Sequence, residues 1–321
     1  MNPELVEQIT KLVYEKLQSQ TEVIEELQHD GEVKFWNHTT NREPQFSVSP
    51  GGEVRKQAVE TNQIPIVESD GISERTGEAV GIENPFNKEE LDELISQTPA
   101  RIGVGRAGLR PKTHTWLKFR YDHAAAVDAV YGDVNQALLD RLALFKVNTK
   151  VVDKEVYVRR PDFGRKLSDE AKQLITQKCK KAPTVQIIVS DGLSSKAVEE
   201  NLEDVYLSLN QSLQSLGLDS GTPFFIEKGR VAVMDDVGEL LKPKVIVYLI
   251  GERPGLVSAE SLSAYLCYEP RLGTIEADRM VISNIHKGGI PPVEAGAYIG
   301  TVIQKILKYQ ASGVSLVQKE Q

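Results

Sequence analysis

The sequence predicts an α/β fold: a mostly parallel sheet flanked by helices, Rossmann-like in its C-terminal domain, with a preceding helical domain and a disordered N-terminal extension. From residue 183 onward, short apolar runs alternate with helix-length amphipathic segments, a pattern typical of parallel sheets covered by helices. The run over 245–250 is continuously apolar, as expected of a strand buried on both faces. Residues 21–85 lack periodic apolar positions and are rich in glycine, amide and acidic residues, so we expect a flexible linker there.

Composition and charge narrow the class of protein. A chain of 321 residues is long enough to bury a full hydrophobic core. Its net charge of −8 argues against a general nucleic-acid binder, because phosphate binding needs a basic surface. No apolar run approaches the ~20 residues of a membrane span, and the N-terminus is acidic where an export signal is basic. Cys179 and Cys267 show no metal-ligand spacing, so we expect reduced thiols in a soluble cytoplasmic protein.

Residues 1–20 are predicted to form an amphipathic targeting helix that stands apart from the rest of the chain. Asn2 suits the capping position and Pro3 the first helical position. The apolar residues that follow recur at helical spacing and share one face. Two interpretations stay open: a terminal helix that packs on its own domain, or an address tag whose apolar face lies in a partner's groove.

Two further domains are predicted after the linker: a mainly helical domain over 86–182 and an α/β domain over 183–313. In the first, helices are expected at 87–95, 116–130, 138–146 and 170–181, with a strand pair or extended loop at 151–158. In the second, strands are expected at 185–189, 224–226, 231–234, 245–250 and 280–282, and helices at 196–216, 259–266 and 293–308.

Polar and glycine residues follow three of the predicted strands, where ligands of α/β sheets bind. They are 190–192, Glu252-Arg253 and 283–286. A structural role as a cap or salt-bridge partner is the alternative for Glu252. Because Pro254-Gly255 constrains the following turn, however, the carboxylate is held in place. We therefore expect a pocket for a sizeable polar ligand rich in amide groups.

The segment 103–108 matches the pattern G-x-G-x-x-G of dinucleotide-binding proteins. That motif needs a strand before the glycines and a helix that starts on them. Here the preceding residues are too few and contain Pro99, and Pro111 falls where the helix should be established. A nucleotide-dependent oxidoreductase therefore remains only an alternative. A basic loop that binds an acidic partner or a phosphate, or one that is merely solvated, is favoured; its cations are Arg101, Arg106, Arg110 and Lys112.

Hydrolytic and metal chemistry find no support in the sequence. The five histidines share no metal-ligand spacing, and neither a G-x-S-x-G motif nor a P-loop is present. The pair Asp235-Asp236 is predicted to cap a helix. We expect no metal site and no self-sufficient catalytic site in this chain.

A set of motifs spread over most of the chain from residue 85 to 313 resembles the small (light) subunit family of ethanolamine ammonia-lyase, an adenosylcobalamin-dependent enzyme. The matching segments are Thr98-Pro-Ala-Arg-Ile-Gly-Val-Gly-Arg-Ala-Gly, Ser190-Asp-Gly-Leu-Ser, Gly229-Arg-Val, Gly238-Glu-Leu-Leu, Gly251-Glu-Arg-Pro-Gly-Leu, Ser261-Leu-Ser, Glu276-Ala-Asp-Arg and Ile282-Ser-Asn-Ile-His-Lys-Gly-Gly-Ile-Pro-Pro-Val-Glu-Ala. Residues 1–85 lie outside the strongest part of this resemblance.

The resemblance implies a carbon–nitrogen lyase that converts ethanolamine to acetaldehyde and ammonia by a radical mechanism carried by the cofactor. A large subunit, a TIM barrel, would hold the substrate site, and this chain would clamp cobalamin at the subunit interface. The implied cofactor contacts are Val231, Glu252 and Val281, the last standing where the family has a cysteine. The implied catalytic residues lie in the large subunit and none in this chain.

The motif D-x-H-x-x-G is absent around all five histidines, which favours cobalamin bound with its own base on cobalt. The resemblance also implies binding partners and a cellular location for the protein. We expect the large subunit as a partner, and the shell or cargo of a bacterial microcompartment as a second one through the N-terminal helix. The expected location is thus the cytoplasm, inside such a compartment. A non-catalytic scaffold, which uses the basic loop and helix only for docking, stays open as an alternative.

Overall fold

The computed structural model of the chain describes residues 81–82, 84–98, 101–256 and 258–321. The predicted targeting helix at 1–20 and nearly all of the predicted linker at 21–85 lie outside the described residues. The first described elements are the helix α2 (Lys88–Ser96), the short strands β1 (Arg106–Ala107) and β2 (Arg110–Pro111), and the long helix α3 (Thr113–Tyr131). Asn87 caps α2, since its side chain accepts a hydrogen bond from the Glu90 N–H.

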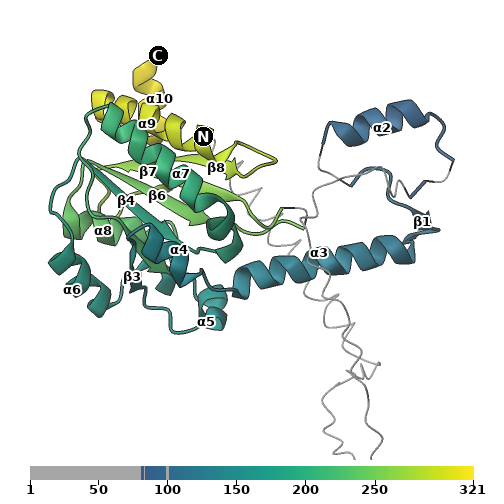
Figure 1. Ribbon diagram of the computed structural model, residues 1–321, viewed down its shortest axis with the longest axis horizontal. Coiled ribbons are helices and arrows are strands. Elements are labelled where there is room, and N and C mark those ends of the chain that lie inside the picture. Colours follow the sequence, from purple (N-terminus) through teal and green to yellow (C-terminus); the bar gives the residue numbers. More distant parts are fainter. Residues whose placement is uncertain (1–80, 83, 99–100, 257) are drawn as a thin grey trace, which may run out of the picture. The chain divides into compact units, whose positions relative to one another are not determined.

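The centre of the fold is a six-stranded sheet with the strand order β3-β5-β4-β6-β7-β8 (Figure 1). β3, β5, β4 and β6 run parallel to one another, whereas β7 runs antiparallel to both β6 and β8. The predicted α/β class is therefore confirmed, but the sheet is mixed and parallel only in part. The strands are β3 (Phe145–Asn148), β4 (Val185–Ser190), β5 (Phe224–Glu227), β6 (Val245–Gly251), β7 (Leu262–Tyr268) and β8 (Arg279–Ile285).

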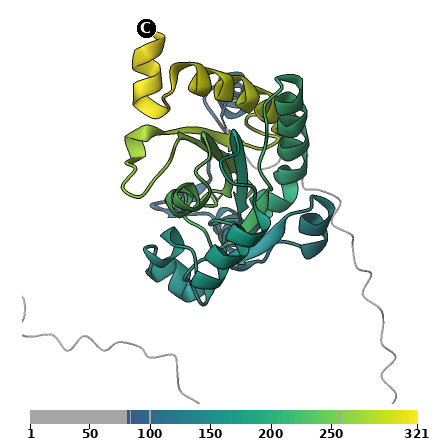
Figure 2. The ribbon, with the colours of Figure 1, turned by 90° about the vertical axis from the view of Figure 1, so that its left-hand side faces the viewer.

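Helices cover both faces of the sheet. α7 and α9 pack on one face, and α6 and α8 on the other, as Figure 1 shows. Figure 2 shows α10 next to α9 at the C-terminus. The helices are α4 (Gln136–Arg141), α5 (Lys154–Arg159), α6 (Asp169–Lys178), α7 (Ser195–Ser215), α8 (Val233–Leu241), α9 (Pro292–Tyr309) and α10 (Gly313–Glu320).

The two central strands are buried along their whole length, as their apolar runs predict. Side chains of successive strand residues point to opposite faces. Thus Ile187 and Val247 pack against α7 and α9, whereas Ile188 and Tyr248 pack against α6 and α8. A sheet covered on both faces needs such uninterrupted apolar strands, which explains why β4 and β6 are the elements most easily predicted.

Two predictions in the C-terminal half are wrong. The segment 259–266 is predicted as a helix, but residues 262–268 form β7, which pairs with both β6 and β8 and is buried along most of its length. The segment 231–234 was predicted as a strand, but Val233 begins α8, and residues 231–232 form the turn before it. In both cases tertiary packing overrides a local pattern too short to distinguish helix from strand.

Two predictions in the preceding segment are also wrong. The helix expected at 138–146 ends at Arg141, and Ala143 adopts a left-handed φ of 53°, which stops the helix and lets β3 begin. The extended structure expected at 151–158 is replaced by α5, which Asp153 caps by accepting from the Val156 N–H at 2.8 Å.

Asp235 and Asp236 lie in the first turn of α8 but do not cap it, contrary to prediction, because Ala232 occupies that position. Asp235 instead forms a buried ion pair with Arg279 of β8, with both carboxylate oxygens 2.8 Å from Nη2. Asp236 accepts a hydrogen bond from the Leu167 N–H at 2.9 Å. The two carboxylates thus tie α8 to the edge strand and to the loop before α6.

We predict that Arg279→Ala lowers the free energy of unfolding by about 3–5 kcal/mol, because it leaves the buried Asp235 carboxylate without its counter-charge. Urea unfolding followed by circular dichroism measures the change. The matched control is Arg159→Ala, which removes an exposed ion pair with Glu155 and should cost less than about 0.5 kcal/mol. Equal losses in the two variants would contradict the assigned role of Arg279.

Candidate functional site

The carboxyl ends of β4, β5 and β6 meet at one edge of the sheet, next to α5. Here lies a cavity of about 70 Å³. For comparison, one water molecule takes up about 30 Å³ of liquid water. Val231 and Glu252, two of the three contacts that the resemblance implies, both line it. The lining residues are Tyr157, Gly192, Leu193, Arg230, Val231, Ile250, Gly251 and Glu252.

Asp191, which follows β4, holds the loops of this edge in place. Its side chain is buried and pairs with the Lys154 ammonium of α5 at 2.8 Å. The other carboxylate oxygen accepts hydrogen bonds from the Lys228 N–H at 2.6 Å and from the Ser190 hydroxyl at 3.1 Å. One buried charge therefore joins the ends of β4 and β5 to α5.

Ser190 uses its full hydrogen-bonding capacity in the same cluster. Besides donating to Asp191, its Oγ accepts from the Gly229 N–H at 3.0 Å and from the Gly192 N–H at 3.2 Å. Gly229 must be glycine, because a Cβ there would lie 2.2 Å from the hydroxyl oxygen of Tyr248. The motif residues around Val231 thus set the path of the backbone that carries it.

Arg230 and Tyr157 form a stacked pair at the wall of the cavity. The guanidinium lies 4.2 Å from the centre of the Tyr157 ring, and its Nη2 donates to the Tyr157 carbonyl at 3.1 Å. The Tyr157 hydroxyl donates to the Gly229 carbonyl at 2.8 Å, and burial raises its pKa. The Nε of Arg230 is buried without a hydrogen-bond partner among the described residues. A buried cationic donor of this kind is suited to a ligand oxygen.

Glu252 lies directly after β6, where its carboxylate Oε1 accepts a hydrogen bond from the Tyr265 hydroxyl at 3.0 Å. Its backbone N–H donates to the Ser261 carbonyl at 3.0 Å, which fixes the residue's position. Burial and the nearby Glu252 carboxylate raise the pKa of Tyr265 to about 12, so the phenol stays a donor at neutral pH. Glu252 forms no ion pair with any described residue, and its hydrogen bond from Tyr265 ties it to β7.

Val281, the third predicted site residue, lies on β8 directly opposite Tyr265 of β7. Residues that pair across two strands project from the same face, so Val281 and Tyr265 are neighbours. Val281 is 47% exposed, although it belongs to a sheet. It does not line the cavity, but Tyr265 connects it to Glu252. Val231 and Glu252 thus line one cavity, and Tyr265, which the sequence analysis missed, lies between Glu252 and Val281.

The third polar strand end, residues 283–286, does not contribute to this cavity, contrary to expectation. β7 separates β8 from β6. The side chains at the end of β8 and just after it form hydrogen bonds within their own turn. His286 Nε2 lies 2.7 Å from Asn284 Oδ1, and His286 Nδ1 accepts from the Gly288 N–H at 3.1 Å. The turn also contains a left-handed φ of 63° at Asn284.

The glycine-rich segment 103–108 is not built like a dinucleotide site. No strand leads into it among the described residues 97–98 and 101–102, and α3 begins only at Thr113. Its last glycine instead takes part in the turn of the small β1–β2 hairpin. This geometry removes the helix N-terminus that would hold a pyrophosphate.

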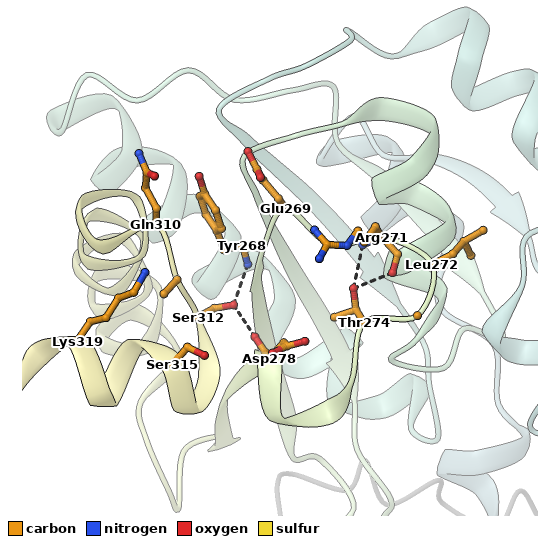
Figure 3. Close-up of a pocket in the computed structure, with 12 residues that line it drawn as sticks. Tyr268, Glu269, Arg271, Leu272, Thr274, Asp278, Gln310, Ser312, Ser315 and Lys319 are labelled. Atoms are coloured by element: carbon orange, nitrogen blue, oxygen red, sulfur yellow. Dashed lines mark hydrogen bonds between the residues drawn. The ribbon is translucent and has the colours of Figure 1, made fainter.

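A larger cavity of about 360 Å³ lies at the opposite end of β7, next to α10 (Figure 3). Its hydrogen bonds are internal: Ser312 Oγ accepts from the Tyr268 N–H at 2.9 Å and donates to the Asp278 carbonyl. Arg271 and Thr274 similarly close a turn between themselves. None of the predicted site residues lines it, so the smaller cavity is the candidate site.

The described residues contain neither a group of metal ligands nor a membrane-spanning helix. No group of three or more histidine, cysteine, aspartate and glutamate side chains is arranged to hold a metal ion there. None of the helices in this part of the chain has the length and apolar character needed to cross a membrane.

The chain is similar to proteins of one family. The family profile described as ethanolamine ammonia-lyase light chain (EutC) matches residues 88–317. A protein of Clostridium tetani called ethanolamine ammonia-lyase small subunit is 45% identical over 277 residues, 85% of this chain and 94% of its own length. Proteins of the same name from Clostridium acetobutylicum and Clostridium perfringens are 50% and 49% identical, covering 72% and 73% of this chain and 96% and 80% of their own.

We predict that Asp191→Asn lowers the free energy of unfolding by about 3 kcal/mol, because Lys154 is then buried without its counter-charge. Adding Lys154→Met should restore part of that loss, since no buried charge remains. Urea unfolding of both variants measures the coupling. Asp219→Asn, at an exposed pair with Lys180, is the control and should cost less than about 1 kcal/mol. A double variant no more stable than Asp191→Asn would contradict the charge assignment.

Proposed function

The chain belongs to the ethanolamine ammonia-lyase light-chain family, and on that premise we propose that it is the small subunit of an adenosylcobalamin-dependent ethanolamine ammonia-lyase. In this proposal it clamps cobalamin at the interface with a large subunit, which holds the substrate site and the catalytic residues. The observation that carries the proposal is the meeting of Val231 and Glu252 at one cavity, with Tyr265 linking Glu252 to Val281.

The residues at this edge fit the chemistry of cobalamin, a flat corrin ring surrounded by amide side chains. One oxygen of Glu252 is occupied by Tyr265, and the other is available to an amide N–H. The unpartnered Nε of Arg230 suits an amide carbonyl. The cavity is far too small for the ring but large enough for one amide arm. We infer that an arm enters it, while the ring lies over Val231, Tyr265 and Val281.

Adenosylcobalamin, when bound, supplies the radical chemistry that converts ethanolamine to acetaldehyde and ammonia. In this proposal the chain binds the cofactor, orients it and excludes water from it. Glu252, held by Tyr265 and by its own backbone, fixes one side of the cofactor in position. Val231 and Val281 offer apolar contact, which also keeps water from the cofactor's edge. Val281 supplies no thiol where the family has a cysteine, so its contact is van der Waals in nature.

We also propose a location for the assembled enzyme: the cytoplasm, inside a bacterial microcompartment. The sequence of residues 1–20 supports this, since its apolar residues share one helical face and residues 21–85 have the composition of a tether. The apolar face would dock on shell or cargo protein.

We predict that Glu252→Ala weakens cobalamin binding by the large–small complex about 10- to 100-fold, the effect of losing hydrogen bonds to a charged group. Association of the two subunits should stay as in the wild type. Equilibrium dialysis followed by absorbance measures cofactor affinity, and gel filtration measures association. Glu269→Ala, at the opposite end of the sheet and paired with Lys244, is the matched control and should change neither.

Unchanged cobalamin affinity in Glu252→Ala would rule out the role of this carboxylate. A wild-type chain that neither joins the large subunit nor supports acetaldehyde release from ethanolamine would rule out the proposed function as a whole. That result would favour the alternative function, in which the chain is a non-catalytic scaffold.

For the N-terminal segment we predict that deletion of residues 1–20 leaves lyase activity intact but abolishes packaging. Ile9→Glu, on the apolar face, should have the same effect, because a charge opposes burial in a groove. Lys11→Glu, on the polar face, is the control and should be packaged normally. Co-purification with shells, measured by immunoblot, distinguishes the variants. Normal packaging of Ile9→Glu would contradict the targeting role.

A further inference from the structure

The long helix α3 carries an apolar stripe that the described residues leave uncovered. Only Ala126 and Ala129 of its 19 residues are buried. At 3.6 residues per turn, its large exposed apolar side chains fall within an arc of about 140°, away from these two alanines. The stripe consists of Trp116, Leu117, Tyr121, Val127 and Tyr131, which are between 39% and 71% exposed.

A basic segment adjoins and overlaps the stripe. Between Glu93 and Asp122 the chain has six cations and no acidic residue, although its net charge is −8. Arg106 and Arg110 lie exposed on the β1–β2 hairpin, and Arg120 lies within the arc of the stripe. A molecule that covers the N-terminal half of the stripe must therefore also face positive charge, whereas Asp128 lies within the same arc nearer the C-terminal end.

Contacts at the middle of α3 and near its C-terminal end tie the helix to residues distant in the sequence. At the middle of the helix, Arg101 forms an ion pair with Asp122, stacks on Phe119 at 4.5 Å, and donates to the Leu256 carbonyl at 3.1 Å. Leu256 belongs to the turn that follows Glu252. Near its end, the Ala129 carbonyl accepts from the Ser195 hydroxyl at 3.2 Å. The stripe is thus held in place and continues the edge that carries Glu252.

We propose that the α3 stripe and the basic segment form the docking surface for the large subunit, whose facing surface would be apolar with an acidic rim. This inference rests on the proposed function. Trp, Tyr and Arg are the residues that dominate the centres of protein interfaces. The contact continues from the Glu252 loop, where the cofactor would lie between the subunits. A symmetric contact with a second copy would place basic segment against basic segment and be repelled.

The test uses the full-length chain and measures its association with the large subunit by titration. Trp116→Ala/Tyr121→Ala and Arg110→Glu/Arg120→Glu should each weaken association at least ten-fold. The charge variant should also lose most of the salt dependence of the wild type, since screened attraction no longer contributes. Tyr298→Ala and Lys308→Glu, exposed positions of α9, are the matched controls and should associate like the wild type. Circular dichroism checks that all variants are folded.

Hydrogen exchange on the wild-type chain provides an independent readout. The amides of α3 should exchange at least ten-fold more slowly when the large subunit is added than in the free chain. Exchange of α3 that stays unchanged when the large subunit is added would show that the subunit does not cover the stripe, and protection that rises with chain concentration would identify a second copy. Either result overturns the inference, as would variants that bind as tightly as their controls. If the wild type assembles normally in those cases, the proposed function stands and only the docking surface is wrong.

Discussion

A single buried carboxylate, that of Asp191, holds together the loops at the carboxyl edge of the sheet. Its negative charge is matched by the Lys154 ammonium, and its second oxygen fixes the Lys228 amide just before Gly229 and Val231. Burying a charge is costly unless it is paired and hydrogen-bonded, so this cluster has one favourable arrangement. The loop that bears Val231 and the wall formed by Arg230 and Tyr157 are positioned by that arrangement.

The reversal of β7 is the second feature on which the site depends. Because β7 runs antiparallel between β6 and β8, Tyr265 lies between Tyr248 and Val281 on one face of the sheet. From there its hydroxyl reaches Glu252 at the end of β6. In a parallel connection a covering helix would pack over this face, whereas the edge around Val281 is open. The mixed sheet thus places an exposed surface beside the Glu252 carboxylate, which Tyr265 holds in position.

Several motif residues serve the fold rather than the ligand. Arg279 neutralises Asp235 in the interior, and Ser190 satisfies two backbone amides while it donates to Asp191. The cofactor contacts proposed here are few, and most of the motif residues around them act on backbone position. These motif residues therefore fix the backbone of the edge on which the proposed contacts lie.

The sequence by itself determined the α/β class, the buried strands β4 and β6, the long helices α7 and α9, and the placement of Glu252 at a strand end, because continuous apolar runs and long periodic segments are local signals. It did not determine β7 or the roles of Tyr265, Arg230 and Lys154. Seven or eight residues fit a helix or a strand equally well, and only pairing with β6 and β8 decides between them. Likewise, the partners of Asp191 lie 37 residues away on both sides, so only the tertiary structure brings those charges together.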